Sequence, residues 1–273
     1  MANRTDLAVE SFEESEKTKL DGVKITEKGN LTSLRVFSET GAKAIGKPIG
    51  NYFTLKVNSF VNDTDLLDGR LDDFSYVLSS LLPDDISSVL VIGLGNDKIT
   101  ADALGPSASD FVLSTRHIMG DVAENIGMNN LFSVACVNTG VLGDTGIESA
   151  EIVKGIVSQI RPSCVITVDA LAAISTDRLG TTVQFSDSGI SPGSGVGNHR
   201  YEISKHTLGI PVISIGIPTV VSTSVFDNNH EPLFVTPREI DKITNQGAKL
   251  IGMGINVCLQ KNLSVEDLLA LVG

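Results

Sequence analysis

The chain has 273 residues, of which 41% are hydrophobic, 20% charged and 5% aromatic, with 26 glycines and no tryptophan. This composition is ordinary for a globular protein, and an aliphatic core with many glycine turns favours a layered α/β fold. The net charge of −12 argues against direct binding of nucleic acid or an anionic membrane, because phosphates repel an acidic surface. The same acidity is equally explained as an aid to solubility.

The chain also contains no signal for export or for metal binding by thiolates. The first residues, MANRTDLAVESFEE, include no apolar signal core, and no stretch of about 18 apolar residues follows, so we expect a cytoplasmic protein. Its three cysteines, Cys136, Cys164 and Cys258, lie among apolar neighbours without a CxxC pair. We expect buried, reduced thiols rather than disulfides or a zinc site.

The first third of the chain has an irregular pattern. Residues 1–30 are polar and lack a clear period, so we expect a partly mobile N-terminal extension. Alternating residues predict strands at 34–37 and 52–57. Apolar residues at helical spacing predict a helix over 65–82, which Pro83 ends.

From residue 88 onward the pattern is regular. Apolar runs predict strands buried on both faces at 89–92, 132–137, 164–168 and 212–217. Helices are predicted at 105–119, from Thr145 or Ser149 to 160, at 237–259 and at 265–272. Residues 181–185 alternate like an edge or flanking strand. We therefore predict one α/β domain over residues 1–273, a three-layer α/β/α sandwich with a mostly parallel central sheet.

Two aspartates follow predicted strands, at the edge where α/β sheets bind ligands. Asp102 comes after the strand at 89–92 and the turn GLGND, and Asp169 directly follows the strand at 164–168. A close pair of carboxylates does not easily ionise twice, so it supplies an acid and a base around one water and can hydrolyse an amide. The spacing equally allows each aspartate to be a helix cap.

Other motifs point less clearly to chemistry. The GLG at 93–95 lacks the third glycine of a dinucleotide fingerprint. The alternating glycines of PGSGVGNHR (192–200) suit either close approach to a ligand or a plain surface loop. No serine elbow is present, which disfavours a serine hydrolase. No metal-ligand spacing relates the four histidines, His117, His199, His206 and His230.

Six stretches, taken together and in order, resemble the spore germination proteases, the endopeptidases that begin degradation of small acid-soluble spore proteins. They are RTDLAVE (4–10), GLGNDKITADALGP (93–106), NTGVLGDTGIESAEIV (138–153), VDALAA (168–173), SDSGISPGSGVGNHR (186–200) and GIPVISIGIPTVV (209–221). The resemblance implies a fold like that of the hydrogenase maturation endopeptidases. It also implies that Asp102 and Asp169 are the two essential aspartates.

The protease hypothesis includes further residues and properties. We expect Asn96 to orient one carboxylate and Gly193, Gly195 and Gly197 to accept substrate backbone. In the hydrogenase relatives the equivalent carboxylates and a histidine gather nickel; no match for that histidine is found, so we predict no metal and no cofactor. The family also implies a homotetramer in the spore core that is made as a zymogen.

Three features depart from the family pattern. Ile174 stands where an arginine usually follows VDALAA, and Ser222 stands where an aspartate usually follows GIPTVV. Only Met1, Ala2 and Asn3 precede RTDLAVE, so we expect no full-length propeptide. These changes bear on substrate preference and zymogen control. The alternatives to a protease are a small-ligand or nucleotide-binding α/β protein, in which GLGN would meet phosphate, and a non-catalytic scaffold.

Overall fold

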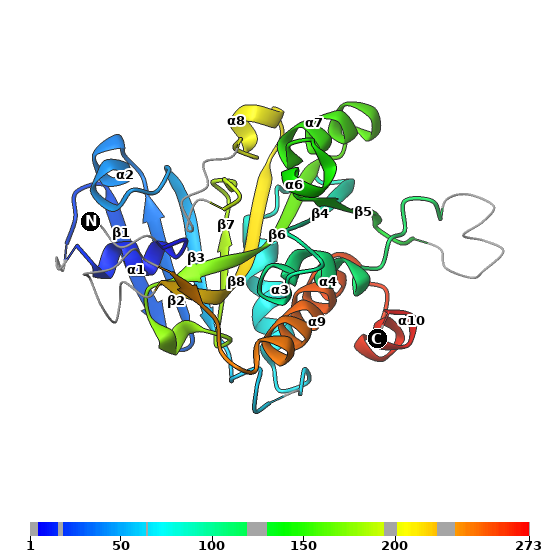
Figure 1. The fold of residues 1–273 in the computed structure, drawn as a ribbon. Coiled ribbons are helices and arrows are strands. Elements are labelled where there is room, and N and C mark those ends of the chain that lie inside the picture. Colours follow the sequence, from blue (N-terminus) through cyan, green and yellow to red (C-terminus); the bar gives the residue numbers. More distant parts are fainter. Residues whose placement is uncertain are drawn as a thin grey trace.

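A mixed sheet runs through the whole molecule in the computed structural model, which describes residues 5–15, 19–63, 65–118, 130–193, 201–222 and 233–272 (Figure 1). Its strand order is β1-β2-β3-β7-β8-β6-β4-β5, with β9 paired to β8. The strands are β1 (Val23–Lys28), β2 (Leu31–Val36), β3 (Gly50–Lys56), β4 (Ser88–Leu94), β5 (Ser133–Gly140), β6 (Cys164–Ala173), β7 (Thr182–Ser186), β8 (Val212–Ser222) and β9 (Phe234–Val235).

The sheet has a parallel half and an antiparallel half. Strands β8, β6, β4 and β5 are parallel, and they coincide with the four apolar runs of the sequence. Strands β1, β2, β3 and β7 pair antiparallel in that order. Strand β7 also pairs antiparallel with β8, and this pairing joins the two halves. The predicted α/β class is therefore confirmed, and its parallel part is extended by an antiparallel half.

Helices cover both faces of the parallel half. The helices of the described ranges are α1 (Ala8–Glu13), α2 (Glu39–Ile45), α3 (Arg70–Leu81), α4 (Leu104–Asp110), α6 (Leu142–Thr145), α7 (Ser149–Ile160), α8 (Lys205–Leu208), α9 (Ile240–Leu259) and α10 (Val265–Val272), with 3-10 turns η1 (Thr100–Asp102) and η2 (Thr176–Arg178). Of these, α1 and α2 pack against β2 and β3 of the antiparallel half. In Figure 1, α3, α4 and α9 lie on one side of the sheet and α7 on the other. This arrangement confirms the predicted three layers.

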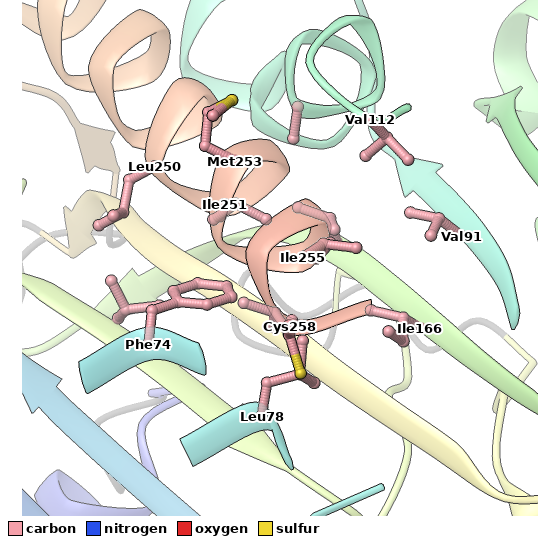
Figure 2. Close-up of a cluster of buried hydrophobic side chains, with 14 of the residues drawn as sticks. Phe74, Leu78, Val91, Val112, Ile166, Leu250, Ile251, Met253, Ile255 and Cys258 are labelled. Carbon is pink, nitrogen blue, oxygen red and sulfur yellow. The ribbon is translucent and has the colours of Figure 1, made fainter. Parts of the chain in front are cut away.

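The alternation of side chains along β4 and β6 divides the core between these faces. Val91 and Ile166 pack with Phe74 of α3 and with Ile251 and Ile255 of α9 (Figure 2). On the opposite face, Leu90, Ile92 and Val165 pack with Val153 of α7. Both faces of these strands are therefore dry, which is why their sequences are apolar throughout.

Helix α4 and strand β7 differ from expectation. The helix predicted over 105–119 ends at Asp110, because the backbone N–H groups of Thr115 and Arg116 turn to the Val134 carbonyl of β5. Strand β7, expected at an edge or flank, lies between β3 and β8 with all five residues buried. It flanks the parallel half and is not an edge, so its alternating pattern does not mark a solvent-facing side.

The N-terminal residues described here are part of the packed structure. Residues 8–13 form α1, and Leu7 and Ala8 are fully buried. Strand β1 is mostly exposed and, within the described ranges, pairs with β2 alone. A six-residue helix and a polar edge strand are too short and too polar to produce a clear period, which explains why the sequence pattern missed both.

The three cysteines are free thiols; Cys164 and Cys258 are buried, as predicted, and Cys136 is half-buried. Burial raises the pKa of each thiol, and that of Cys164 rises to about 12. These thiols are therefore protonated and weak nucleophiles near neutral pH. None of the helices in the described ranges is long and apolar enough to cross a membrane.

Candidate functional site

Asp169 lies within β6 rather than after it, because β6 continues to Ala173. Its neighbour β4 pairs with β6 only as far as Val168, whereas β8 follows β6 to its end. Asp169 is thus the first residue beyond the end of the β4 ladder. It is only 5% exposed, and its Oδ1 accepts a hydrogen bond of 3.0 Å from the backbone N–H of Ala170.

Asp102 ends the short turn η1, directly before α4. The N-cap residue of α4 is Ala103, and no side chain caps the helix. Instead, Oδ2 of Asp102 accepts the backbone N–H of Asn96 at 2.8 Å. Asp102 is therefore not the N-cap residue of α4, and Asp169 lies inside a strand. The turn needs Gly95, whose φ is 110° and whose added Cβ would lie 2.0 Å from the Asp102 carbonyl oxygen.

Both aspartates line one cavity of about 260 Å³. Its wall also includes Asp6 and a set of apolar side chains, Leu94, Ile99, Val141, Leu171 and Phe234. No lysine, arginine or histidine is among the described residues that line it. The three carboxylates of this wall repel a phosphate group, which argues against the nucleotide alternative.

The structure brings only some of the expected binding residues to this cavity. Gly193 lines it and has a φ of 73°. Asn96 contributes its backbone N–H to Asp102, while its side-chain oxygen accepts the N–H of Lys98 at 2.9 Å. Gly195 and Gly197 lie outside the described residues.

Asp6 is a wall residue that the strand-end rule did not identify. Its backbone N–H donates to the Ala172 carbonyl at 2.9 Å, and its Oδ2 accepts the Ala172 N–H at 2.8 Å. Gln184 of β7 holds the same segment, since it donates to the Asp6 carbonyl at 3.0 Å and accepts the Ala8 N–H at 2.8 Å. The only sequence signal for Asp6 was its place in the RTDLAVE stretch.

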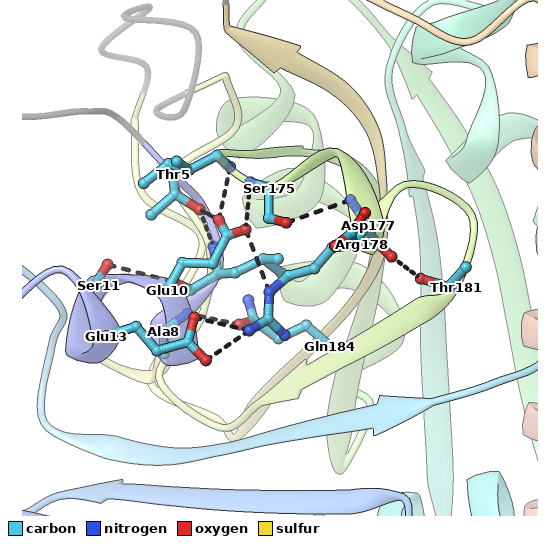
Figure 3. Close-up of polar contacts among 12 residues, drawn as sticks. Thr5, Ala8, Glu10, Ser11, Glu13, Ser175, Asp177, Arg178, Thr181 and Gln184 are labelled. Atoms are coloured by element: carbon cyan, nitrogen blue, oxygen red, sulfur yellow. Dashed lines mark hydrogen bonds and ion pairs between the residues drawn. The ribbon is translucent and has the colours of Figure 1, made fainter. Parts of the chain in front are cut away.

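Glu10 anchors this segment to the turn after β6 (Figure 3). Its buried carboxylate accepts the backbone N–H groups of Ile174 at 2.8 Å and Ser175 at 2.9 Å, and also the Thr5 hydroxyl. The guanidinium of Arg178 lies 3.4 Å from Glu10. Because Ile174 takes part through its backbone, the departure from arginine leaves this bond unaffected.

We expect Glu10→Gln to destabilise the protein by about 2 to 3 kcal/mol, because an amide cannot accept both N–H groups and leaves one buried donor unpaired. The matched control is Glu13→Gln, which removes an ion pair to the same Arg178 from a side chain that is 55% exposed. The control should cost about 1 kcal/mol or less. Urea unfolding followed by circular dichroism compares them, and equal losses would contradict the anchoring role of Glu10.

A second cavity of about 250 Å³ adjoins the first and shares Asp6 and Leu171 with it. Its wall includes Lys47, Tyr52 and the hydroxyl groups of Ser186 and Ser214. The Lys47 ammonium donates to the Thr5 carbonyl at 2.8 Å, and burial lowers its pKa. Burial also raises the pKa of Tyr52 to about 12. This cavity offers a polar space beside the aspartates.

Within the described part of the chain, no three His, Cys, Asp or Glu side chains are grouped so that they could hold a metal ion. His117 and His206 are described but line neither cavity. His199 and His230 fall outside the described residues.

Comparison with known proteins points to one family. A family model described as germination protease matches residues 2–230. A germination protease from Caldanaerobacter subterraneus is 38% identical over 97% of this chain and 96% of its own length. The protein of that name from Clostridium perfringens is 36% identical over 97% of both chains. The one from Priestia megaterium is 39% identical over 97% of this chain and 76% of its own.

Among solved structures, the chain is similar to the NiFe hydrogenase maturation protease HycI from Thermococcus kodakarensis. The two share 18% identity, with a TM-score of 0.38, over 66% of this chain and 99% of the other. That similarity is too low to support an argument about the site.

Proposed function

The chain belongs to the germination protease family, and we propose that it is an aspartate-dependent endopeptidase that hydrolyses small acid-soluble spore proteins. Its membership supports a protease role in spore germination. One observation carries the mechanism. Asp102 and Asp169 lie 67 positions apart in the sequence, yet both line one cavity at the end of the β4 ladder.

In this mechanism a water molecule lies between the two carboxyl groups, of which one is ionised and the other protonated. The ionised group takes a proton from the water as it attacks the peptide carbonyl carbon, and the protonated group gives its proton to the leaving amine. The Asn96 N–H holds Asp102 and the Ala170 N–H holds Asp169, so both are oriented before substrate arrives. The apolar part of the wall reduces contact with bulk water, which strengthens the electrostatic interactions inside.

The substrate of such a site is an unfolded segment, because a folded chain does not present its backbone to a cavity. We propose that the enzyme cuts spore protein that has been released from DNA, since a net charge of −12 opposes approach to a protein–DNA complex. We also propose that the chain acts as one peptidase domain, assembled as a homotetramer in the spore core.

The proposal predicts that purified protein cuts a small acid-soluble spore protein at defined positions. Mass spectrometry of the products identifies the new termini. A chelator should leave the rate unchanged, because we expect no metal, and saturating DNA should slow cleavage at low salt by about tenfold or more. Intact substrate after long incubation would contradict the protease assignment, and equal rates with and without DNA would contradict the released-substrate proposal.

A further inference from the structure

Two different partners occupy the edge of β6 beside Asp169, and residues 169–171 lie between them. At one end of this edge, β4 pairs with β6 up to Val168. At the other end, Asp6 donates its N–H to the Ala172 carbonyl and accepts the Ala172 N–H, and Glu10 accepts the N–H of Ile174. In the described ranges, neither partner pairs with Ala170.

The backbone groups of Ala170 point toward this edge. The Val165 N–H donates to the carbonyl of Pro211, the residue directly before β8. Odd-numbered residues of β6 therefore direct their backbone groups to β8. Ala172 directs both of its groups to Asp6 on the opposite side. Because successive residues of a strand alternate, Ala170 shares the direction of Ala172. Ala170 also lines the cavity that holds the two aspartates.

The backbone N–H and the carbonyl of Ala170 differ in what they can bind. The N–H already donates to Asp169 Oδ1 at 3.0 Å, so the carbonyl is the group that faces an incoming chain. The four residue steps from Val168 to Ala172 span about 13 Å at strand spacing. That length admits one or two extended residues of another chain, flanked by the end of β4 and by Asp6.

We propose that the Ala170 carbonyl accepts a backbone N–H of the substrate, so that the substrate adds to the edge of β6 as a short strand next to Asp169. This inference rests on the proposed protease function and names its backbone anchor. A backbone bond of this kind reads an extended chain without regard to side chains. The bond also fixes the distance between the neighbouring peptide bond of the substrate and the Asp169 carboxylate, because Asp169 and Ala170 are consecutive residues of β6.

The first part of the test uses a peptide that the enzyme cuts, in which each backbone N–H near the cut is replaced in turn by an ester oxygen. An ester keeps the extended shape but cannot donate. We expect one position, within two residues of the cut bond, at which kcat/KM falls by about 3- to 10-fold. Uniform small effects at every position would overturn the proposal.

The second part identifies the partner on the enzyme. Replacing Leu171 by its α-hydroxy acid analogue turns the Ala170 carbonyl into an ester carbonyl, which is a weaker acceptor. In that enzyme the sensitive peptide ester should cost less than about 2-fold. The matched control is the α-hydroxy analogue at Ala173, which weakens the Ala172 carbonyl and likewise removes an N–H directed to β8. The control should keep the full penalty of the peptide ester.

The outcomes separate this inference from the proposed function. If the unmodified enzyme cuts the all-amide peptide but the ester penalty is unchanged in the Leu171 analogue, the substrate N–H binds elsewhere and only the inference fails. If the unmodified enzyme cuts no peptide, the protease mechanism fails. Affinities of the same ester series, measured by calorimetry on Asp102→Asn enzyme, then decide whether the Ala170 pairing exists.

Discussion

Asp102→Asn and Asp169→Asn should each lower kcat/KM for a cleaved spore protein by about 10³-fold or more. Proton transfer by a positioned side chain contributes about 10² to 10⁴ in rate, and an amide neither takes nor gives the required proton. Both residues line the same cavity, and each is held by one backbone N–H. Asn can keep an oxygen toward that N–H, so the fold should survive the change.

A matched control for the aspartate variants is Asp144→Asn. Asp144 is 42% exposed, pairs with Lys98 at 3.1 Å and does not line the cavity. Its loss should leave kcat/KM within about twofold and stability within about 1 kcal/mol. Circular dichroism and thermal unfolding confirm that all three variants are folded. Full activity in either cavity variant would show that the chemistry belongs to other residues.

Gly105→Ala should destabilise the protein by about 3 kcal/mol, because the new methyl group meets backbone atoms that cannot move aside. Its Cβ would lie 2.2 Å from the Leu94 carbonyl oxygen and 2.4 Å from that of Val168. These short distances show that α4 packs directly against the backbone of β4 and β6. Since only Ala103 separates Asp102 from α4, the variant should also lose activity under conditions in which it is still folded.

The control for Gly105 is Gly155→Ala in α7. Nothing lies within 4 Å of a Cβ at Gly155, and alanine in a helix interior is favoured over glycine by about 0.5 to 1 kcal/mol. Chemical denaturation should thus move the two midpoints in opposite directions. A Gly105→Ala protein as stable as the parent would mean that α4 does not pack this closely on the sheet.

The sequence predicted the regular part of this fold because its helices and strands are long and periodic. The helix predicted at 265–272 matches the bounds of α10, and the four apolar runs mark the four parallel strands. Helix α4 was predicted too long, because the chain after Asp110 turns toward a backbone carbonyl of β5. Tertiary contacts of that kind leave no trace in a local pattern.

The site was only partly predictable for the same reason. The rule that ligands bind beyond strand ends led to Asp102 and Asp169, although β6 continues past Asp169. That continuation depends on Asp6 and Glu10, which lie 166 and 164 residues from the groups they bind. Such distant pairings are invisible to periodicity. The polar run that contains them resembled a mobile extension, yet its Asp6 lines the cavity.

The most direct test of the shared-water mechanism is the rate of the double variant, Asp102→Asn with Asp169→Asn, compared with the rates of the two single variants. If the carboxylates act as one unit around one water, the second change removes nothing further, and the double variant should match the single variants within about threefold. A double variant slower than either single variant by the product of their losses would show that the aspartates act independently, and would contradict the shared-water mechanism.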